Sequence, residues 1–246
     1  MLSLPLLSGL AGAILATSFL SGLFGMAGGM ILMGVLLLML PVAQAMVLHG
    51  VTQLAANGWR AWLWRRHVAW PVAAGYAAGG LLALAAFASL RLVPDKAVVL
   101  VVLGAMPFAV RLLPERLAPN VARRGNALLC GAVCTALQLL AGVSGPVLDV
   151  FFHDSGLDRR AVVATKALTQ SFGHGLKLVY FGGLAGAGLP DAPVVLLAVT
   201  VAVAGTTLAR GVLDRMDEAV FRLWSRRIIT MTALAYLGQG AWDMLV

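Results

Sequence analysis

The chain has 246 residues, of which 61% are hydrophobic and 11% are charged, whereas a soluble globular domain averages roughly 25% charged residues. Its mean hydropathy of +0.93 likewise excludes a water-soluble domain of ordinary composition. The formal net charge is +8, but the arginines lie in loops beside apolar segments, where membrane proteins concentrate cytoplasmic positive charge. We therefore predict an all-α integral membrane protein that does not bind nucleic acid.

Ten apolar segments follow one another along the chain, five in each half, with short loops rich in Arg, Pro and Gly between them. In the N-terminal transmembrane repeat, residues 1–113, the segments are approximately 4–24, 29–40, 43–64, 70–90 and 96–113. In the C-terminal transmembrane repeat, residues 125–246, they are approximately 126–141, 145–153, 159–181, 193–210 and 225–245. A linker at 114–124 joins the two repeats.

The second segment of each half is unusually short. These segments hold about 12 and 9 residues, against the approximately 20 that a helix needs to cross the hydrocarbon core. Each short segment is therefore either a tilted, shortened crossing or a broken, re-entrant half-helix.

Loop charges predict that the two repeats have opposite orientations in the membrane. The loop after the third segment is basic in the first half, at 65–67, but its counterpart at 182–191 has no basic residue. The loop after the fourth segment shows the reverse contrast, with Arg91 and Lys96 in the first half. Five arginines stand there in the second half: Arg210, Arg215, Arg222, Arg226 and Arg227. Counting positive residues predicts inverted repeats and a cytoplasmic central linker.

Two polar stretches 117 residues apart repeat the same residue types at the same spacing. The first contains His49, Thr52, Gln53, Asn57, Gly58 and Arg60, and the second contains Lys166, Thr169, Gln170, His174, Gly175 and Lys177. Helix positions four apart share a face, so each stretch predicts a polar stripe on a membrane helix. A charged Lys166 at membrane depth costs on the order of 2.5–3.5 kcal/mol, which favours a shared polar cavity between the halves.

Two more modest interpretations of these stripes stay open. The polar groups could only tie helices together through hydrogen bonds, each worth roughly 0.6 kcal/mol. For Thr52 and Thr169 taken alone, helix packing is the favoured interpretation.

Glycines break the chain before the second segment of each half. Gly25 and Gly28 align with Gly142 and Gly145 at the same offset of 117 residues, and Gly29 follows the first pair. A helix that begins at such a break points free N–H groups and a partial positive charge into the cavity, where anions bind. The alternative role is close helix packing through small residues.

Three further residues are candidates for coupling or gating. Asp149 is an acid embedded in the apolar stretch 147–152. It could pair with Lys166, carry a coupling proton, ligate a cation, or act as a solvated or capping acid. Arg60 and Lys177 lie near the ends of the polar helices, where long basic side chains reach toward the interface, and either could gate the cavity or attract anions.

Three motifs resemble the sulfite exporter TauE/SafE family: the glycine-rich break at 22–29, the string His49-Gly-x-x-Gln53-x-x-x-Asn57, and the run 161–166. The resemblance covers nearly the whole chain, although the second glycine break departs from the fuller glycine run of the family. It implies a bacterial inner-membrane carrier that moves small sulfur-containing anions, such as sulfite, sulfoacetate or other sulfonates, outward and driven by an ion gradient.

Our main hypothesis is a secondary transporter with its substrate site between the repeats. Lys166 would supply charge, His49 and His174 would donate hydrogen bonds or take up a proton, and the remaining ligands would be Gln53, Asn57, Gln170, Thr52, Thr169 and the helix starts at Gly28, Gly29 and Gly145. The expected partners are the anion, a coupling H⁺ or Na⁺, membrane lipids and a second copy in a homodimer.

Two alternatives belong to other functional classes. One is a cation carrier that uses Asp149 as a ligand. The other is an intramembrane enzyme that uses His49, His174 and Asp149, which is disfavoured because the apolar segments contain no paired carboxylates and no nucleophile with an evident base. We therefore expect no enzymatic activity, no cofactor and no metal site.

Overall fold

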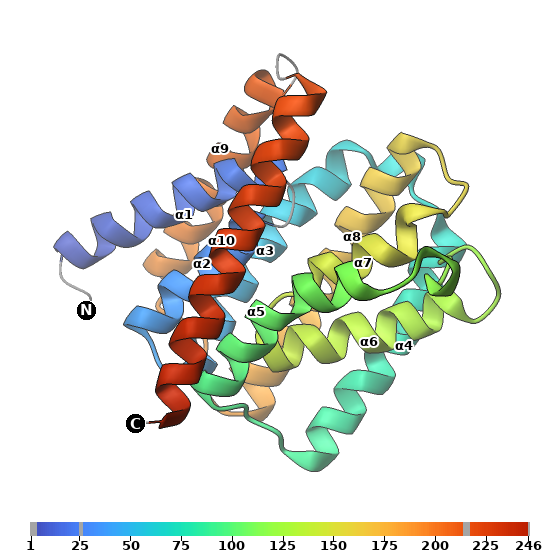
Figure 1. The fold of residues 1–246 in the computed structure, drawn as a ribbon. Coiled ribbons are helices and arrows are strands. Elements are labelled where there is room, and N and C mark those ends of the chain that lie inside the picture. The colour runs from blue at the N-terminus through green and yellow to red at the C-terminus, as the bar shows by residue number, and fades with distance from the viewer. Residues whose placement is uncertain (1–3, 25–26, 214–216, 246) are drawn as a thin grey trace.

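The structure, a computed structural model, describes residues 4–24, 27–213 and 217–245, and this part of the chain contains ten α-helices and no strand. The helices are α1 (Leu4–Phe24), α2 (Ala27–Met39), α3 (Val42–Leu63), α4 (Trp70–Leu90), α5 (Lys96–Leu112), α6 (Asn126–Ala141), α7 (Gly145–His153), α8 (Arg159–Leu178), α9 (Ala192–Leu213) and α10 (Glu218–Leu245) (Figure 1). The prediction of an all-α protein is confirmed.

Three helices in the described part are long and apolar enough to cross a membrane, judged by length and composition. These spans are Leu7–Phe24, Trp70–Leu90 and Ala192–Ala209. Helices α3 and α8 are of similar length, with 22 and 20 residues, but they carry the polar stripes, so their mean hydropathy is lower.

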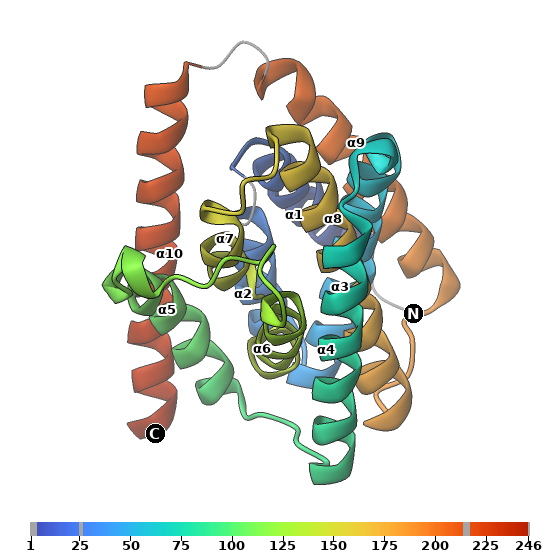
Figure 2. The same cartoon turned by 90° about the vertical axis from the view of Figure 1, so that its right-hand side faces the viewer.

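The main helix contacts are the same when each helix of one half is replaced by its counterpart in the other half. Helix α1 packs along α9 and α6 packs along α4, while α3 packs on α8 and α5 packs on α10. In Figure 2, α5 and α10 lie on one side, α3, α4 and α9 lie on the other, and α2 and α7 lie between them. This pairing is what two structural repeats would produce, and their opposite orientation stays a prediction.

The second helix of each half is short, as the sequence indicates. Helix α2 has 13 residues and α7 has 9. At 1.5 Å per residue, α7 is about 14 Å long, roughly half of the 30 Å hydrocarbon core. A helix of this length is too short to reach from one membrane surface to the other.

The end of α6 requires a glycine. Gly142 follows the helix with φ of +80°, a left-handed conformation that favours glycine. A β-carbon at Gly142 would also lie 2.8 Å from the Met33 sulfur and 3.1 Å from the Met46 sulfur. These two constraints fix the backbone that leads from α6 into α7.

The start of α8 is fixed by an N-cap. The Asp158 carboxylate accepts hydrogen bonds from the backbone N–H groups of Arg160 at 2.9 Å and Ala161 at 3.0 Å, as short acidic side chains do at helix starts. The hydrogen bond from the Ala161 N–H is the main cause that lowers the pKa of Asp158 below its usual range.

Three helix ends extend furthest past the sequence prediction. The chain after α8 continues as a π-helical turn, Val179–Leu184, and not only to 181. Helix α9 ends at Leu213 and not at 210, and α10 begins at Glu218 and not at 225. In each case helical hydrogen bonding continues past the apolar run, into residues that hydropathy assigns to a loop.

The linker between the halves packs against the end of α7. Val121 is buried, and its backbone N–H donates to the Phe151 carbonyl oxygen at 2.8 Å. The Asn120 amide donates to the carbonyl of Asp154. These hydrogen bonds attach the linker to the C-terminal end of α7.

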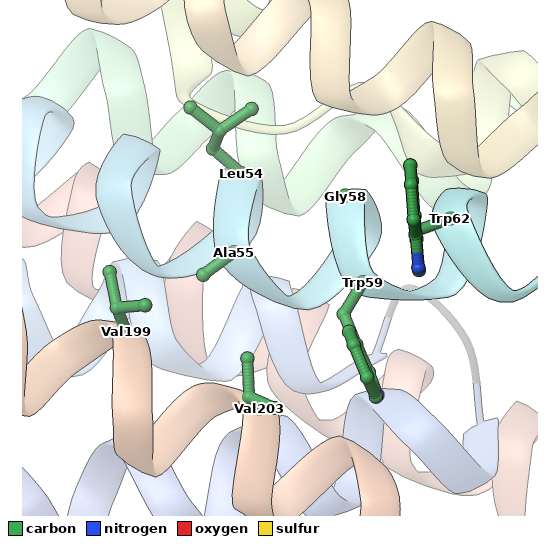
Figure 3. Close-up of a pocket in the computed structure, with 7 residues that line it drawn as sticks. All are labelled: Leu54, Ala55, Gly58, Trp59, Trp62, Val199 and Val203. Carbon is green, nitrogen blue, oxygen red and sulfur yellow. The ribbon is translucent and has the colours of Figure 1, made fainter.

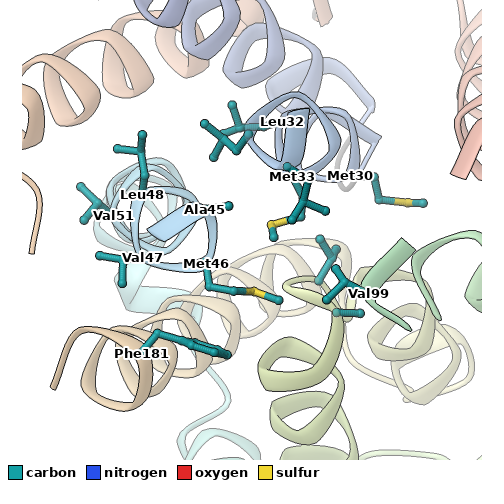
Figure 4. Close-up of a cluster of buried hydrophobic side chains, with 14 of the residues drawn as sticks. Met30, Leu32, Met33, Ala45, Met46, Val47, Leu48, Val51, Val99 and Phe181 are labelled. Carbon is teal, nitrogen blue, oxygen red and sulfur yellow. The ribbon is translucent and has the colours of Figure 1, made fainter. Parts of the chain in front are cut away.

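The largest hydrophobic cluster lies around α2 and α3. Figure 4 shows Met30, Leu32 and Met33 of α2 beside residues of α3 that include Ala45, Met46 and Leu48. Val99 of α5 and Phe181 of the π-helical turn complete the cluster. Methionine is flexible and fills irregular gaps, and here it packs α2 against the helix that carries the first polar stripe.

Candidate functional site

A fully buried lysine joins the two halves of the molecule. The side chain of Lys177 on α8 has 0% exposure. Its Nζ lies 2.7 Å from Nδ1 of His49 on α3 and donates to the Gly142 carbonyl oxygen at 3.1 Å. Both of these partners are neutral acceptors, and no acidic side chain within the described residues forms an ion pair with this ammonium.

The surroundings of His49 fix its tautomer. Its Nε2 lies 2.9 Å from the carbonyl oxygen of Gly29, and because a carbonyl only accepts, Nε2 must carry a hydrogen. In the neutral ring, Nδ1 then presents a lone pair to the ammonium of Lys177. A doubly protonated ring would instead point an N–H at that ammonium. The His49–Lys177 pair can therefore hold only one positive charge at this distance.

His174 lies beside this pair on α8. Its ring centroid is 5.6 Å from that of His49, with the planes at 61°. The side chain is buried, and its Nδ1 has no hydrogen-bond partner among the described residues. The two histidines of the predicted site are therefore neighbours, one from each half.

Further buried polar atoms on the elements around this pair also lack partners in the described part of the chain. They are Nε2 of Gln53, both amide atoms of Gln138, and Oγ of Ser144. The Gln138 amide lies against Gly173, the residue before His174, and Ser144, two residues after Gly142, is the N-cap of α7. Buried polar groups are normally hydrogen-bonded, and each unsatisfied one costs about 1–3 kcal/mol. Unused donors and acceptors of this kind suit a polar ligand.

The first polar stripe gathers around the start of α2. The absent side chain of Gly29 leaves room for Gln53, whose Oε1 would lie 3.3 Å from a β-carbon there. The Asn57 amide donates to the Gln53 backbone carbonyl at 3.0 Å. Four predicted ligands thus lie close together. Gly29 is at the start of α2, and His49, Gln53 and Asn57 lie on the face of α3 that meets α2 and α8.

Lys166 lies apart from this centre. It forms an ion pair with Asp149 of α7, and the two side chains are 27% and 42% exposed. Lys166 precedes Lys177 by 11 residues, which is about 16 Å along the helix axis. The pairing of Lys166 with Asp149 was one of the open alternatives, and the cation that contacts His49 is Lys177.

The two threonines and Gln170 contribute less to the centre. The hydroxyl of Thr52 donates to the Leu48 carbonyl at 2.9 Å, and that of Thr169 donates to the Lys166 carbonyl at 3.0 Å. Both hydroxyls are thus satisfied within their own helices, as the packing interpretation expects. Gln170 is half-buried on α8.

The glycines divide into two roles. Gly28 packs against α1, because a β-carbon there would overlap backbone atoms of Thr17 and Ser21. Gly29 instead faces the amide of Gln53. Gly145 is buried as the first residue of α7, and Gly25 lies outside the described residues.

Arg60 occupies the position equivalent to Lys177 in the first half and binds a similar acceptor. Its Nη2 donates to the Ser21 carbonyl, in the last turn of α1, at 3.3 Å. Lys177 binds the carbonyl that ends α6. Cations are favoured at helix C-termini, so each half holds a basic residue there.

Sequence reasoning missed Gln138, Ser144 and Gly173. The internal duplication selected the candidates, and the position equivalent to Gln138 is a serine in α1, at residue 21. A usable signal was Gln138, the single amide in the apolar run 127–141, since a polar residue at membrane depth is costly and usually functional.

No three His, Cys, Asp or Glu side chains gather into a possible metal site within the described part of the chain. Comparison with protein families finds that the model described as sulfite exporter TauE/SafE matches residues 10–236. Comparisons with curated proteins and with solved structures gave no match.

Proposed function

Because the chain belongs to the sulfite exporter TauE/SafE family of membrane transporters, we propose that it exports small sulfur-containing oxyanions such as sulfite, sulfoacetate or other sulfonates. The observation that carries this proposal is the buried amino group of Lys177, which contacts the ring of His49 and a backbone carbonyl and no acidic side chain among the described residues; we propose that it is charged when the anion is bound.

A buried charge is strongly unfavourable unless it is paired. An anion that binds beside Lys177 supplies the missing negative charge. Its oxygens can accept from the unused amide donors of Gln53 and Gln138 and from the hydroxyl of Ser144, and hydrogen bonds to a charged acceptor are stronger than neutral ones. The same surroundings do not suit a cation, and Asp149, the ligand in the cation-carrier alternative, is paired with Lys166.

We propose that protons drive the transport through the His49–Lys177 pair. In the packed state this pair holds one positive charge across the boundary between α3 and α8. Alternating access in transporters with two repeats separates one half from the other, which would part these side chains and let each hold its own proton. Histidine is suited to this role because it titrates near cellular pH.

The rest of the predicted arrangement completes the proposal. The basic loop charges support a cytoplasmic position for the linker at 114–124, and the inner membrane is the location that the family resemblance implies. The Lys166–Asp149 pair and Arg60 lie outside the His49–Lys177 contact, and Arg60 would gate access to the site.

Anion flux in proteoliposomes tests the proposal. Sulfite and sulfoacetate uptake are measured with and without an imposed pH gradient for the wild type, Lys177→Met and Lys166→Met. The control changes the same residue type on the same helix, at the exposed ion pair. We expect Lys177→Met to lose at least tenfold in flux and Lys166→Met to stay within about threefold, which is the difference expected between a buried unpaired charge and an exposed pair. Full flux in Lys177→Met would reject the site.

A further inference from the structure

An apolar groove runs along the outer face of α3, and it has no part in the transport site. Its volume is about 500 Å³. Figure 3 shows that Leu54 and Trp62 lie on the side of α3 away from α9, that Ala55 and Trp59 lie on the side toward it, and that Val199 and Val203 of α9 point toward α3. At 100° per residue, these α3 positions lie opposite His49, Gln53 and Asn57, so the groove faces away from Lys177.

The groove opens toward the surface that lipid covers. Trp62 is 60% exposed, and only 22% of the membrane-span candidate Ala192–Ala209 of α9 is buried within the molecule. The stretch from Leu54 to Trp62 covers about 12 Å along the helix axis. A shallow, open groove lined by apolar side chains suits a hydrocarbon chain better than a compact polar solute.

A cation marks one end of the groove. The guanidinium of Arg65 lies over the Trp62 ring at 4.3 Å from its centroid, and Nη1 donates to the Trp62 carbonyl at 3.0 Å. Arg65 is exposed and forms no ion pair with the described residues. Its other N–H groups remain available, and guanidinium groups bind phosphate through two parallel hydrogen bonds.

We propose that this groove binds one anionic phospholipid, with an acyl chain between α3 and α9 and the headgroup phosphate at Arg65. The positive charge selects an anionic headgroup over a zwitterionic one, and the tryptophans hold Arg65 at the depth of the lipid phosphates. The loop that contains Arg65 is predicted to be cytoplasmic, so the lipid belongs to that leaflet.

Native mass spectrometry of the full chain tests this proposal. The purified protein is titrated with phosphatidylglycerol and, separately, with phosphatidylethanolamine that carries the same acyl chains. We expect the wild type to retain one phosphatidylglycerol in preference to phosphatidylethanolamine. Arg65→Gln should bind it about fivefold more weakly, the order of magnitude of one lost cation–lipid contact, while Arg66→Gln, with the same loss of charge at the next exposed residue, should bind like the wild type.

Two variants that fill the groove from different helices, Ala55→Phe and Val203→Phe, should lose both lipids from this site. Equal retention of the two lipids by the wild type would overturn the proposal. Equal weakening in Arg65→Gln and Arg66→Gln would mean that general surface charge alone attracts the lipid. A dimer that Ala55→Phe dissociates would assign the groove to a second copy of the chain instead.

Discussion

Lys177 and Arg60 occupy equivalent positions in the two halves, yet of the two only Lys177 hydrogen-bonds a side chain of the opposite half within the described residues. Both bind a carbonyl at the end of the first helix of their own half. Lys177 additionally reaches His49 of the first half at 2.7 Å. The two halves therefore contribute unequally to the centre, in spite of their similar sequences.

This inequality predicts different results for Lys177→Met and Arg60→Met. Lys177→Met should abolish anion flux, whereas Arg60→Met should reduce it only severalfold, because Arg60 is half-buried and lies outside the His49 contact. A buried charge without an ionic partner is strongly unfavourable, and an apolar side chain of similar volume removes this cost. Thermal unfolding in detergent should thus show that Lys177→Met is at least as stable as the wild type. A marked loss of stability would mean that Lys177 has a structural role.

The N-cap of α8 provides a prediction about stability and pH. Asp158→Ala should lower the midpoint of thermal unfolding, because the amides of Arg160 and Ala161 lose their acceptor. Asp158→Asn, which retains an amide oxygen as acceptor, should stay close to the wild type at neutral pH.

The direction of the pH effect follows from the lowered pKa of Asp158. A carboxylate with a lowered native pKa stabilises the fold fully above its ordinary pKa, and this stabilisation is lost as the pH falls through the native value. The difference between wild type and Asp158→Ala should therefore be constant near neutral pH and shrink only in acid. A difference that grows on acidification would contradict this assignment.

Hydropathy and glycine breaks predicted most of the fold. The predicted segments 4–24, 70–90, 126–141 and 145–153 coincide with α1, α4, α6 and α7, because each has an apolar run that a glycine, proline or charged residue ends. The π-helical turn after α8 and the first turns of α10 extend past the predicted segments, since apolar composition does not record helical hydrogen bonding beyond the run.

Sequence alone could not decide which lysine contacts His49. Lys166 and Lys177 are 11 residues apart, close to three whole turns at 3.6 residues per turn, so they share one helix face. Only depth distinguishes them. Depth is set by tertiary structure, here by the Gly142 carbonyl that α6 presents to Lys177 and by the Asp149 carboxylate that α7 presents to Lys166.

The adjacent glycines at the start of α2 should respond differently to the same substitution. In Gly28→Ala the new methyl group would overlap backbone atoms of Thr17 and Ser21, and such overpacking costs about 1–3 kcal/mol. In Gly29→Ala it would press only on the Gln53 amide, at 3.3–3.6 Å.

We therefore expect Gly28→Ala to lower stability and yield, and Gly29→Ala to remain folded but to transport severalfold more slowly. Unfolding midpoints and flux per folded molecule, measured on both variants, separate the two effects. Wild-type flux in Gly29→Ala would remove Gln53 from the proposed anion site.

The proton-coupling role of His49 is tested with a side chain that can form the same two hydrogen bonds but does not titrate. In His49→Gln, the amide N–H₂ can donate to the Gly29 carbonyl and the amide oxygen can accept from Lys177, which replaces both contacts of the ring. The variant should still exchange external for internal anion, at a reduced rate, because the charge of Lys177 remains. Acceleration of net flux by a pH gradient should disappear, since the pair no longer passes a proton between its members.

The ratio of gradient-driven uptake to anion exchange, measured in the same proteoliposomes, isolates this effect from any loss of folded protein. A ratio equal to that of the wild type would show that the coupling proton is carried elsewhere, with His174 as the next residue to substitute.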